Sequence, residues 1–438
     1  MVFLYSIVLT LGFIILLPRF IFDAVTKGKY AAGFGQRLGF LPAFDSLGRK
    51  VVWLHCVSVG EANAALPLAK KLKQEFPQLS LVVSTTTNTG QRVARESYAD
   101  IADLVFYLPF DWRFTVRRSL RHIDPTVVLL TETELWFNFI RESYKHDARV
   151  CIVNGRLSER SFVGYGWIKK FMKRMLSYLD LALMQTNADA TRLMSLGARG
   201  SKVKVTGNLK FDHDSAVEPS PLTTEFRERF GITPEAPLII AASTHSPEEK
   251  WVLEAFTMAW KSSSENLPRL MIVPRHPERF DEVAALIKDT AFSYVRRSDA
   301  PSESDKTAEL ILLDSIGELR AAYPLAEIVF VGGSLIPHGG QSIFEPAAAG
   351  KAIITGPHTA NFDAAVKEFH AQNALVQISK AGEDAIPILA AEFSRLLANA
   401  DERNKLGSNA LSVMQNNRGA VTRTIGYLKD YFVSVART

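Results

Sequence analysis

Apolar and polar positions alternate along most of the chain in a way that predicts strands and helices in turn. Short apolar runs indicate buried strands, and the longer stretches between them carry apolar residues at helical spacing. This order is typical of parallel βαβ units. Helices such as Ala62–Phe76 and Phe139–His146 are expected. In the first half of the chain the expected strands are Val51–His55, Leu79–Ser84, Leu104–Tyr107, Thr126–Leu130, Arg149–Val153, Leu181–Met184 and Val203–Val205.

The alternation is interrupted at residues 208–236, which we interpret as an interdomain connection. This segment is polar and rich in proline, including Pro219, Pro221 and Pro234. After about Gly382, alanine- and leucine-rich periodicity predicts helices. Strands are expected again at Leu238–Ala242, Leu270–Val273, Leu310–Leu313, Ile328–Val331 and Ala352–Ile354. We therefore expect two doubly wound α/β domains, residues 23–207 and 237–438. The last helices are candidates to pack back on the first domain.

The first 22 residues form a separate hydrophobic segment. No charged side chain occurs over Met1–Pro18, and a helix of this length would be roughly 27 Å long, close to the hydrocarbon thickness of a bilayer. No basic residue precedes the apolar run, which disfavours a cleaved signal peptide. Arg19, Lys27 and Lys29 follow the run and predict a cytoplasmic location for the rest of the chain. A buried core helix is disfavoured because all faces are apolar. We expect residues 1–22 to be a membrane anchor, either spanning or lying in one leaflet.

Composition narrows the class of protein without identifying a function. A length of 438 residues suits two domains, and 47% apolar with 22% charged residues is near the globular average. A net charge of +5 suits work near anionic phosphates or an anionic membrane, but it is too small to indicate nucleic acid. Cys56 and Cys151 each lie in an apolar run, where buried thiols are expected, and their spacing predicts no metal site.

Three acidic residues follow predicted strands of the first half. Glu61 comes after the first strand, at the expected start of a helix, where a carboxylate either complements the helix dipole or serves as a general base. Glu132 and Glu134 follow an apolar strand directly. An extended strand end would place them on one face, whereas a helical start would separate them. N-capping by Thr131 or Thr133 is the structural alternative for this motif.

Polar and glycine-rich loops follow the strands of the second half. Arg275 and His276 stand between prolines after one strand, and a guanidinium there suits a phosphate. Gly332, Gly333 and Ser334 close another strand, so we expect their backbone amides to be open to a phosphate. The candidates that come next are Gln341, Ser342 and Glu345, at the start of an expected helix whose N-terminus would bind an anion and whose Glu345 would reach ribose hydroxyls.

Smaller motifs complete the set. Ser243 and Thr244 end the first strand of the second half, with His245 beside them. Lys210 in the connection is either a phosphate contact or a solvated lysine. Residues 167–179 form a basic amphipathic helix candidate that either touches the membrane surface or packs on the core. The chain has neither GxGxxG nor a Walker lysine, which disfavours NAD and P-loop sites.

Taken together, the motifs resemble those of the Kdo transferases of Gram-negative bacteria, which build the inner core of lipopolysaccharide; Kdo is 3-deoxy-D-manno-octulosonic acid. The resemblance covers nearly the whole chain. It is carried, in order, by HCVSVGE, ETELW, NGRLSERS, GNLKFD, STHSPEE, PRHPER, GGS, FEPAAAGKAIITGPH and ANF. It implies a GT-B type inverting glycosyltransferase with two facing Rossmann-like domains and an N-terminal anchor helix. It also implies transfer of Kdo from CMP-Kdo to the lipid A precursor, lipid IVA, at the cytoplasmic face of the inner membrane, without a metal.

The resemblance also assigns roles to residues. Glu61 becomes the general base, Glu132 and Glu134 lie on the acceptor side, and the donor is held by Ser243, Thr244, Arg275, His276, Gly332, Gly333, Ser334, Gln341, Ser342 and Glu345. One departure matters: the family usually has Gly-Gly-His-Asn before the Glu-Pro pair, and here Gln341 and Ser342 replace the last two. Both replacements can hydrogen-bond a phosphate, so nucleotide binding is expected to survive.

Two other functions are compatible with this organisation. One is a transferase of the same fold that uses a UDP- or GDP-sugar. The other is a membrane-tethered nucleotide-binding scaffold without catalysis. The motif set disfavours the first, and the joint presence of Glu61, Arg275 and Glu345 disfavours the second.

Overall fold

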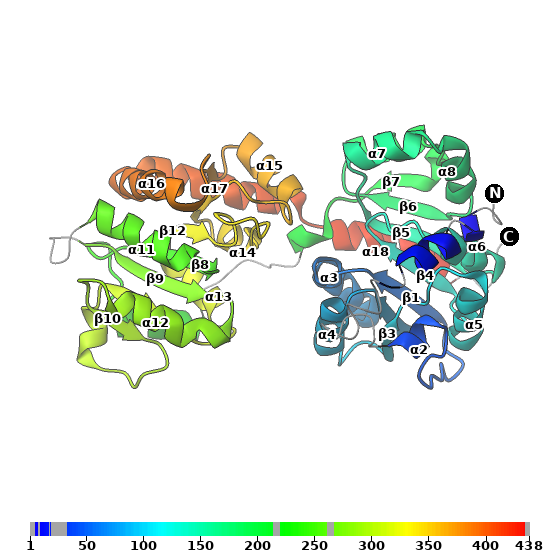
Figure 1. Ribbon diagram of the computed structural model, residues 1–438, viewed down its shortest axis with the longest axis horizontal. Helices are drawn as coiled ribbons and strands as arrows, with labels where there is room; N and C mark the ends of the chain where they lie inside the picture. The colour runs from blue at the N-terminus through cyan, green and yellow to red at the C-terminus, as the bar shows by residue number, and fades with distance from the viewer. Residues whose placement is uncertain are drawn as a thin grey trace. The chain divides into compact units, whose positions relative to one another are not determined.

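The chain divides into two compact units, each of which is described by itself. The computed structural model describes residues 5–7, 9–16, 18, 33–212, 220–260 and 267–433. Unit 1 comprises Met1–His213 and Asn417–Thr438, and unit 2 comprises Asp214–Asn416 (Figure 1). The chain passes from unit 2 back into unit 1 at the end of helix α17, Ala400–Asn417.

Unit 1 is built on a parallel sheet of seven strands, in the order β3-β2-β1-β4-β5-β6-β7. Each strand predicted for this half is present, with ends shifted by at most two residues. The residues of these strands are apolar and mostly fully buried. Such continuous apolar runs are stable as strands of a parallel sheet that is covered on both faces. Their bounds are β1 Val51–Cys56, β2 Ser80–Thr85, β3 Leu104–Tyr107, β4 Val127–Thr131, β5 Arg149–Gly155, β6 Leu181–Met184 and β7 Val203–Val205.

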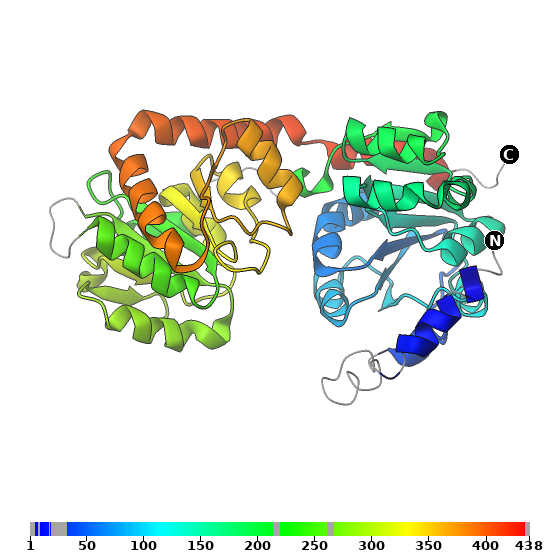
Figure 2. The same cartoon turned by 45° about the horizontal axis from the view of Figure 1, so that its top comes forward.

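Helices cover both faces of the unit 1 sheet. One apolar layer is filled from α5, α6, α8 and α9, and the other from α3, α4 and α18. The red C-terminal helix α18 lies among the elements of unit 1 (Figures 1 and 2) and buries Ile425 and Leu428 there. The helix bounds are α2 Phe34–Arg37, α3 Val59–Glu75, α4 Asn88–Ser97, α5 Arg113–Ile123, α6 Phe137–Lys145, α7 Glu159–Gly166, α8 Lys169–Leu176, α9 Asn187–Ser195 and α18 Ala420–Val433, with 3-10 turns η1 Gly200–Lys202 and η2 Leu209–Asp212.

Unit 2 is built on a second parallel sheet of seven strands, in the order β10-β11-β9-β8-β12-β13-β14. The expected two parallel α/β domains are therefore confirmed. Two edge strands were not predicted, β10 and β14, because they are short and only half-buried. The bounds are β8 Leu238–Thr244, β9 Arg269–Pro274, β10 Tyr294–Arg296, β11 Leu310–Leu312, β12 Ala326–Val331, β13 Ala352–Thr355 and β14 Val376–Gln377.

Helices also pack on the unit 2 sheet. Apolar side chains of α11, α12 and α16 pack against apolar side chains of the central strands and form one buried layer with them. The bounds are α10 Pro221–Arg229, α11 Glu248–Ala259, α12 Phe280–Lys288, α13 Leu319–Ala322, α14 Phe344–Ala348, α15 Asp363–Ala371, α16 Ile386–Ala398 and α17 Ala400–Asn417, with 3-10 turns η3 Pro277–Arg279, η4 Glu303–Lys306, η5 Tyr323–Leu325 and η6 Gly382–Ala385.

The segment interpreted as a connection contains a helix that the sequence analysis did not predict. Ser220 caps α10 through a capping box with Thr223, and Pro221 occupies the first turn, where a missing N–H costs nothing. Phe226 and Phe230 of this region are fully buried. Pro221, one of the prolines that suggested a loop, thus starts a helix. The basic amphipathic stretch 167–179 is confirmed in part, as α8, which begins at Lys169 and buries Met172 and Met175.

The N-terminal segment packs on unit 1. Residues 5–7 and 9–16 are helical. The Tyr5 hydroxyl donates to Asp111 Oδ2 at 2.7 Å, and Trp112 Nε1 donates to Thr10 Oγ1 at 3.1 Å. Within the described ranges, no helix is both long enough and apolar enough to cross a membrane. The predicted anchor, residues 1–22, lies partly outside these ranges, at 1–4, 8, 17 and 19–22, and stays a prediction.

Candidate active site

In each sheet the strand order reverses beside the first strand of the unit, between β1 and β4 in unit 1 and between β8 and β12 in unit 2. Loops that leave the carboxyl ends of the strands on either side of such a point diverge, and ligands bind in the crevice they leave. The candidate residues follow these strands. Each unit therefore carries candidate residues at the position that its topology favours.

Glu61 is fixed in orientation by the start of α3. Ser58 is the N-cap of this helix, and its hydroxyl accepts from the Glu61 N–H while donating to Glu61 Oε1 at 3.1 Å. Glu61 Oε2 accepts from the Val57 N–H at 2.8 Å and from the Thr131 hydroxyl at 2.7 Å. The Glu61 carboxylate, 7% exposed, is thus held by donors from both β1 and β4 ends.

Glu61, Glu132 and Glu134 come together as one acidic cluster. Burial raises the pKa of Glu134 to about 7, with further contributions from the charges of Glu61 and Glu132. Burial also raises the pKa of Glu61, and the charge of Glu132 adds to that effect. Lys210 Nζ lies 3.8 Å from Glu132 Oε1 and supplies a positive charge. A carboxyl whose pKa is near neutrality can accept a proton from a hydroxyl and release it again.

The backbone around the two acids differs from both expected geometries. β4 ends at Thr131, and Glu132 has a left-handed φ of 52°, so the chain turns neither as an extended strand nor as a helix start. The suggestion that Thr131 or Thr133 caps a helix is wrong. Thr131 instead bonds the Glu61 carboxylate, Thr133 donates to the Arg156 carbonyl, and α6 begins only at Phe137.

In unit 2 the loops after β8, β9 and β12 meet. The Arg275 N–H donates to the Thr244 carbonyl at 2.9 Å, which joins the ends of β8 and β9. Gly332 approaches β8 so closely that a Cβ would lie 2.7 Å from the Ser243 carbonyl oxygen. Ser243 has a left-handed φ of 54°, and the buried Thr244 hydroxyl has no hydrogen-bond partner among the described residues.

The expectation that the Gly332–Ser334 amides are open to a phosphate is wrong. Glu248, at the start of α11 and fully buried, accepts hydrogen bonds from the N–H groups of four residues. The distances are 2.6 Å for Gly333, 3.0 Å for Ser334, 2.9 Å for Leu335 and 3.0 Å for His245. The Gly332 N–H is used within the sheet, donating to the Ala242 carbonyl. The carboxylate thus fills the position expected for a phosphate at these amides, so an anion needs other donors, such as polar side chains.

Such side chains lie around His245. Its ring centroid is 4.1 Å from that of His338 and 5.1 Å from that of His276, and its Nε2 lies 2.9 Å from Gln341 Nε2. Burial, with the charges of His338, His276, Arg275 and Arg279, lowers the pKa of His245 to about 4. Arg275 and His276 are exposed. These residues bring together positive and neutral donors suited to an anionic ligand.

The remaining donor candidates lie nearby in sequence. Ser342 follows Gln341, and its hydroxyl accepts from the Phe344 N–H at 3.4 Å. The Ser334 hydroxyl has a structural role, because it donates to the Val331 carbonyl and accepts from the Gly356 N–H. Glu345 is half-buried in the first turn of α14. No contact that the structure shows for the Glu345 side chain tests its predicted role at a ribose.

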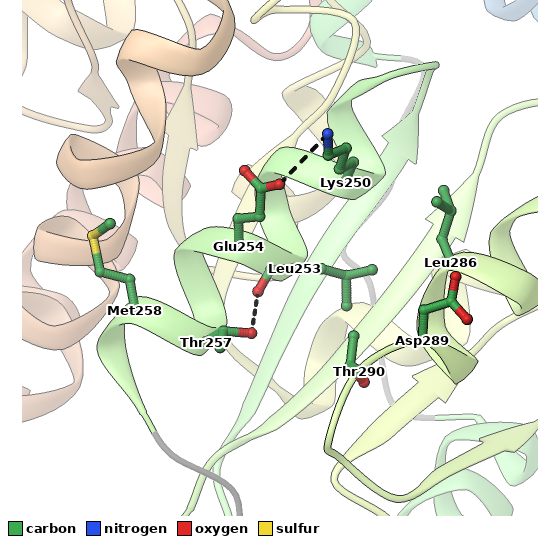
Figure 3. Close-up of a pocket in the computed structure, with 8 residues that line it drawn as sticks. All are labelled: Lys250, Leu253, Glu254, Thr257, Met258, Leu286, Asp289 and Thr290. Atoms are coloured by element: carbon green, nitrogen blue, oxygen red, sulfur yellow. Dashed lines mark hydrogen bonds and ion pairs between the residues drawn. The ribbon is translucent and has the colours of Figure 1, made fainter.

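A separate cavity of about 550 Å³ lies between α11 and α12. It is lined by both polar and apolar side chains, and none of the predicted site residues takes part. Figure 3 shows Leu253 and Leu286 facing it, with the Lys250–Glu254 pair on one side. In the part of the chain that the structure describes, no group of three or more His, Cys, Asp and Glu side chains is placed to hold a metal ion. The expectation of a metal-independent reaction stays a prediction.

Two contributors were not in the predicted set. Glu248 was missed because nothing in STHSPEE distinguishes it from a helix-start acid, and three of its four amide partners lie 85 to 87 positions away. His338 was missed because a single histidine between Pro337 and Gly339 gave no pattern. His245 was noted only as a neighbour of Ser243 and Thr244. The sequence did indicate it, because Ser243, Thr244 and His245 are three consecutive residues with hydrogen-bonding side chains at the end of a buried strand.

Comparison with known proteins supplies the family context. A family model described as 3-deoxy-D-manno-octulosonic-acid transferase (kdotransferase) matches residues 32–213. The 3-deoxy-D-manno-octulosonic acid transferase of Haemophilus influenzae is 34% identical over 408 residues, 93% of this chain and 93% of that protein. The protein of the same name from Bordetella pertussis is 32% identical over 383 residues, 87% of each.

A solved structure shares the fold at low identity. The UDP-GlcNAc 2-epimerase of Neisseria meningitidis, solved bound to UDP-GlcNAc, aligns with a TM-score of 0.57 at 15% identity. The alignment covers 87% of this chain and all of the other. At this identity the likeness concerns only the fold, and it extends over both α/β units.

Proposed function

The chain belongs to the 3-deoxy-D-manno-octulosonic acid (Kdo) transferase family of glycosyltransferases, and on that premise we propose that it transfers Kdo from CMP-Kdo to the lipid A precursor, lipid IVA. The transfer inverts the anomeric configuration and uses Glu61 as the general base. The observation that carries this proposal is the acidic cluster of unit 1, in which Glu61 is oriented by three donors and lies beside a carboxyl with a pKa of about 7.

The chemistry follows from a carboxylate with a raised pKa. Glu61 accepts the proton of the acceptor hydroxyl as that oxygen bonds to the anomeric carbon of Kdo. The bond from this carbon to the phosphate oxygen breaks, and CMP leaves with the electron pair. A transition state of oxocarbenium character, attacked on the face opposite to the leaving group, gives inversion. The raised pKa of Glu61 makes it a better proton acceptor than an ordinary carboxylate once it is ionised.

Unit 2 supplies the proposed donor site. Arg275 and His276 lie exposed at the end of β9 and suit the phosphate and the sugar carboxylate of CMP-Kdo. The Glu248 network holds the Gly333 loop in place beneath them, so that His245 and Gln341 are presented from a rigid base. Ser243, Ser342 and Glu345 are proposed as further donor contacts, and Glu132 and Glu134 as acceptor contacts. We propose that no metal takes part.

The proposed location is the cytoplasmic face of the inner membrane. The apolar segment of residues 1–22, which has no charged side chain before Arg19, is the candidate anchor. Within this segment, the described side chains of Leu11, Ile14 and Ile15 are exposed. Trp167, 89% exposed, stands just before the basic helix α8. Exposed apolar side chains beside basic ones favour a membrane surface that also holds the lipid acceptor.

The test compares donors and bases in one assay. Transfer is measured with CMP-Kdo, with CMP and UDP as competitors, for the wild type, Glu61→Gln and the control Glu75→Gln, an exposed residue of the same helix. We expect inhibition by CMP and not UDP, loss of about 10²–10⁴-fold in Glu61→Gln with CMP binding retained, and an unchanged control. Preference for UDP would contradict the donor, and a fully active Glu61→Gln would contradict the base. CMP binding without any product would favour a non-catalytic scaffold.

A further inference from the structure

We propose that unit 2 takes up a proton on the histidine cluster, defined as His245, His276 and His338, when the anionic nucleotide donor binds. The ligand class is a nucleoside monophosphate, free or joined to an acidic sugar. The inference rests on the proposed function, because that function places such an anion at this site. It adds a property that the proposed function does not contain, namely coupling of donor binding to pH.

The geometry places two other imidazoles close to that of His245. His245 follows β8, His276 follows β9, and His338 lies in the loop after β12, so each comes from a different strand end. The ring of His245 lies between the other two, with centroid separations of 4.1 and 5.1 Å. Two positive charges at such distances repel strongly in a partly buried site, so the rings hold fewer protons together than they would separately.

Two arginines are among the charged neighbours of this cluster. Arg275 and Arg279 both act on His245, and both lower its pKa. The acids nearby are already engaged. Glu248 uses both carboxylate oxygens on four backbone N–H groups, and Glu249 forms a two-bond ion pair with Arg279, which also holds Glu282.

One further acid, Glu278, lies beside the cluster. Glu278 Oε1 lies 3.8 Å from His276 Nδ1, and it is an exposed side chain, so water screens its charge. In the described residues no carboxylate contacts the His245 side chain. Without a ligand, Arg275 therefore has no ion-pair partner among the described residues, and burial and repulsion lower the pKa of His245 to about 4.

An anion reverses this balance. A phosphate placed against Arg275 and the histidine cluster supplies the missing negative charge, which favours the protonated imidazole. Groups that gain protons in the complex take them from solution, so binding becomes proton-linked. The result is a ligand that binds more tightly as the pH falls toward neutrality from the alkaline side.

Gln341 allows His245 to exist in both states. In the neutral ring, Nε2 accepts from the Gln341 amide N–H across the observed 2.9 Å. In the protonated ring, Nε2–H donates to the Gln341 carbonyl oxygen once the amide has turned over. Gly333 lies against both side chains: a Cβ there would be in ordinary van der Waals contact, 3.4 Å from His245 Cδ2 and from Gln341 Cγ, and only its left-handed φ of 67° favours glycine. Gln341 is thus a positioning residue for either protonation state.

The experiment measures protons taken up per bound CMP. Calorimetric titration of the full chain at pH 8 is run in two buffers that differ in ionisation enthalpy, since the difference in heat reports protons exchanged. At this pH the CMP phosphate, whose second pKa is about 6, is fully ionised before it binds. We expect a clear fractional uptake, up to about one proton, and a dissociation constant that rises by up to about tenfold per pH unit above pH 7.5.

Variants assign the proton. His245→Asn and His338→Asn should each lower the uptake and flatten the pH dependence, whereas His370→Asn, an exposed histidine of α15, should change neither. Wild type that binds CMP without uptake overturns the inference and leaves the proposed function standing. Uptake unchanged in both cluster variants also overturns it, because the proton then resides on the phosphate or elsewhere. A wild type that fails to bind CMP contradicts the proposed function itself, and the inference falls with it.

Discussion

Glu248 offers the sharpest test of how the donor loop is built. Its two carboxylate oxygens accept four backbone N–H bonds of 2.6 to 3.0 Å, three of them from the loop after β12. Glu248→Gln keeps the size and shape of the side chain but turns one oxygen into an NH2 group. Two of the four N–H donors then face another donor in a site that excludes water.

The magnitude follows from the bonds lost. A hydrogen bond to a charged group contributes about 1.5–3 kcal/mol, so losing two costs about 3–6 kcal/mol before any relaxation. The total stability of a domain is only about 5–15 kcal/mol, so the effect is large. We expect unit 2 to lose about 4 kcal/mol of its free energy of unfolding and the loop to open more often.

Two measurements follow the change. Urea unfolding of the full chain gives the free energy, and hydrogen exchange of peptides covering residues 330–336 reports the loop directly, with acceleration on the order of 10³-fold at Gly333, Ser334 and Leu335. The matched control is Glu254→Gln on the same helix. Its side chain is 45% exposed and lies 3.8 Å from Lys250 (Figure 3), so we expect a loss under about 0.5 kcal/mol.

The reasoning would be refuted by a small effect. If Glu248→Gln changes the free energy of unfolding by less than about 1 kcal/mol and leaves exchange at Gly333 as slow as in the wild type, the carboxylate does not hold the loop. An equal loss in Glu254→Gln would show that the helix, rather than the network, is sensitive. Either outcome would reopen the backbone amides as candidate phosphate contacts.

Three further predictions concern other sites. Burial raises the folded-state pKa of Glu134 to about 7, so its contribution to stability is present below about pH 4.5 and lost as pH rises through 7; Glu134→Gln should therefore gain in melting temperature over the wild type at pH 8 and not at pH 4. Tyr5→Phe removes a 2.7 Å bond to Asp111, whose pKa is raised to about 7 by burial, and should cost about 2 kcal/mol in urea unfolding at pH 8 and less at pH 5; an equal loss at both would contradict the ionised partner. Gly333→Ala must adopt a φ of 67° and should lower stability by about 1–2 kcal/mol and weaken CMP binding in calorimetry; unchanged affinity would separate this loop from the donor site.

Much of the fold was predictable because local patterns of apolar and polar residues distinguish its strands from its helices. The central strands are short, apolar and buried on both faces, so their hydrophobic runs stand out against the helices between them. β14 is two residues long and half-buried, and it therefore lacks that signal. α10 was hidden by Pro221, which reads as a breaker in sequence but is favourable at the first turn of a helix.

The candidate site was predictable where chemistry follows a strand directly. Glu61 and Glu134 meet because parallel strands β1 and β4 are neighbours and bring their carboxyl ends to one edge. Long-range pairing was not predictable. The bond from Thr131 to Glu61 and three of the four bonds to Glu248 join segments far apart in the chain, and no spacing in the sequence indicates them. The expectation of open amides at Gly333 was wrong for this reason.

The most direct test of the central claim is formation of a Kdo-lipid product. Purified full-length chain is incubated with CMP-Kdo and lipid IVA, and the lipid products are analysed by mass spectrometry and for anomeric configuration. The account predicts a lipid that gains Kdo with inverted configuration, together with release of CMP. Intact acceptor after prolonged incubation, from a protein that is folded and binds CMP, would contradict it.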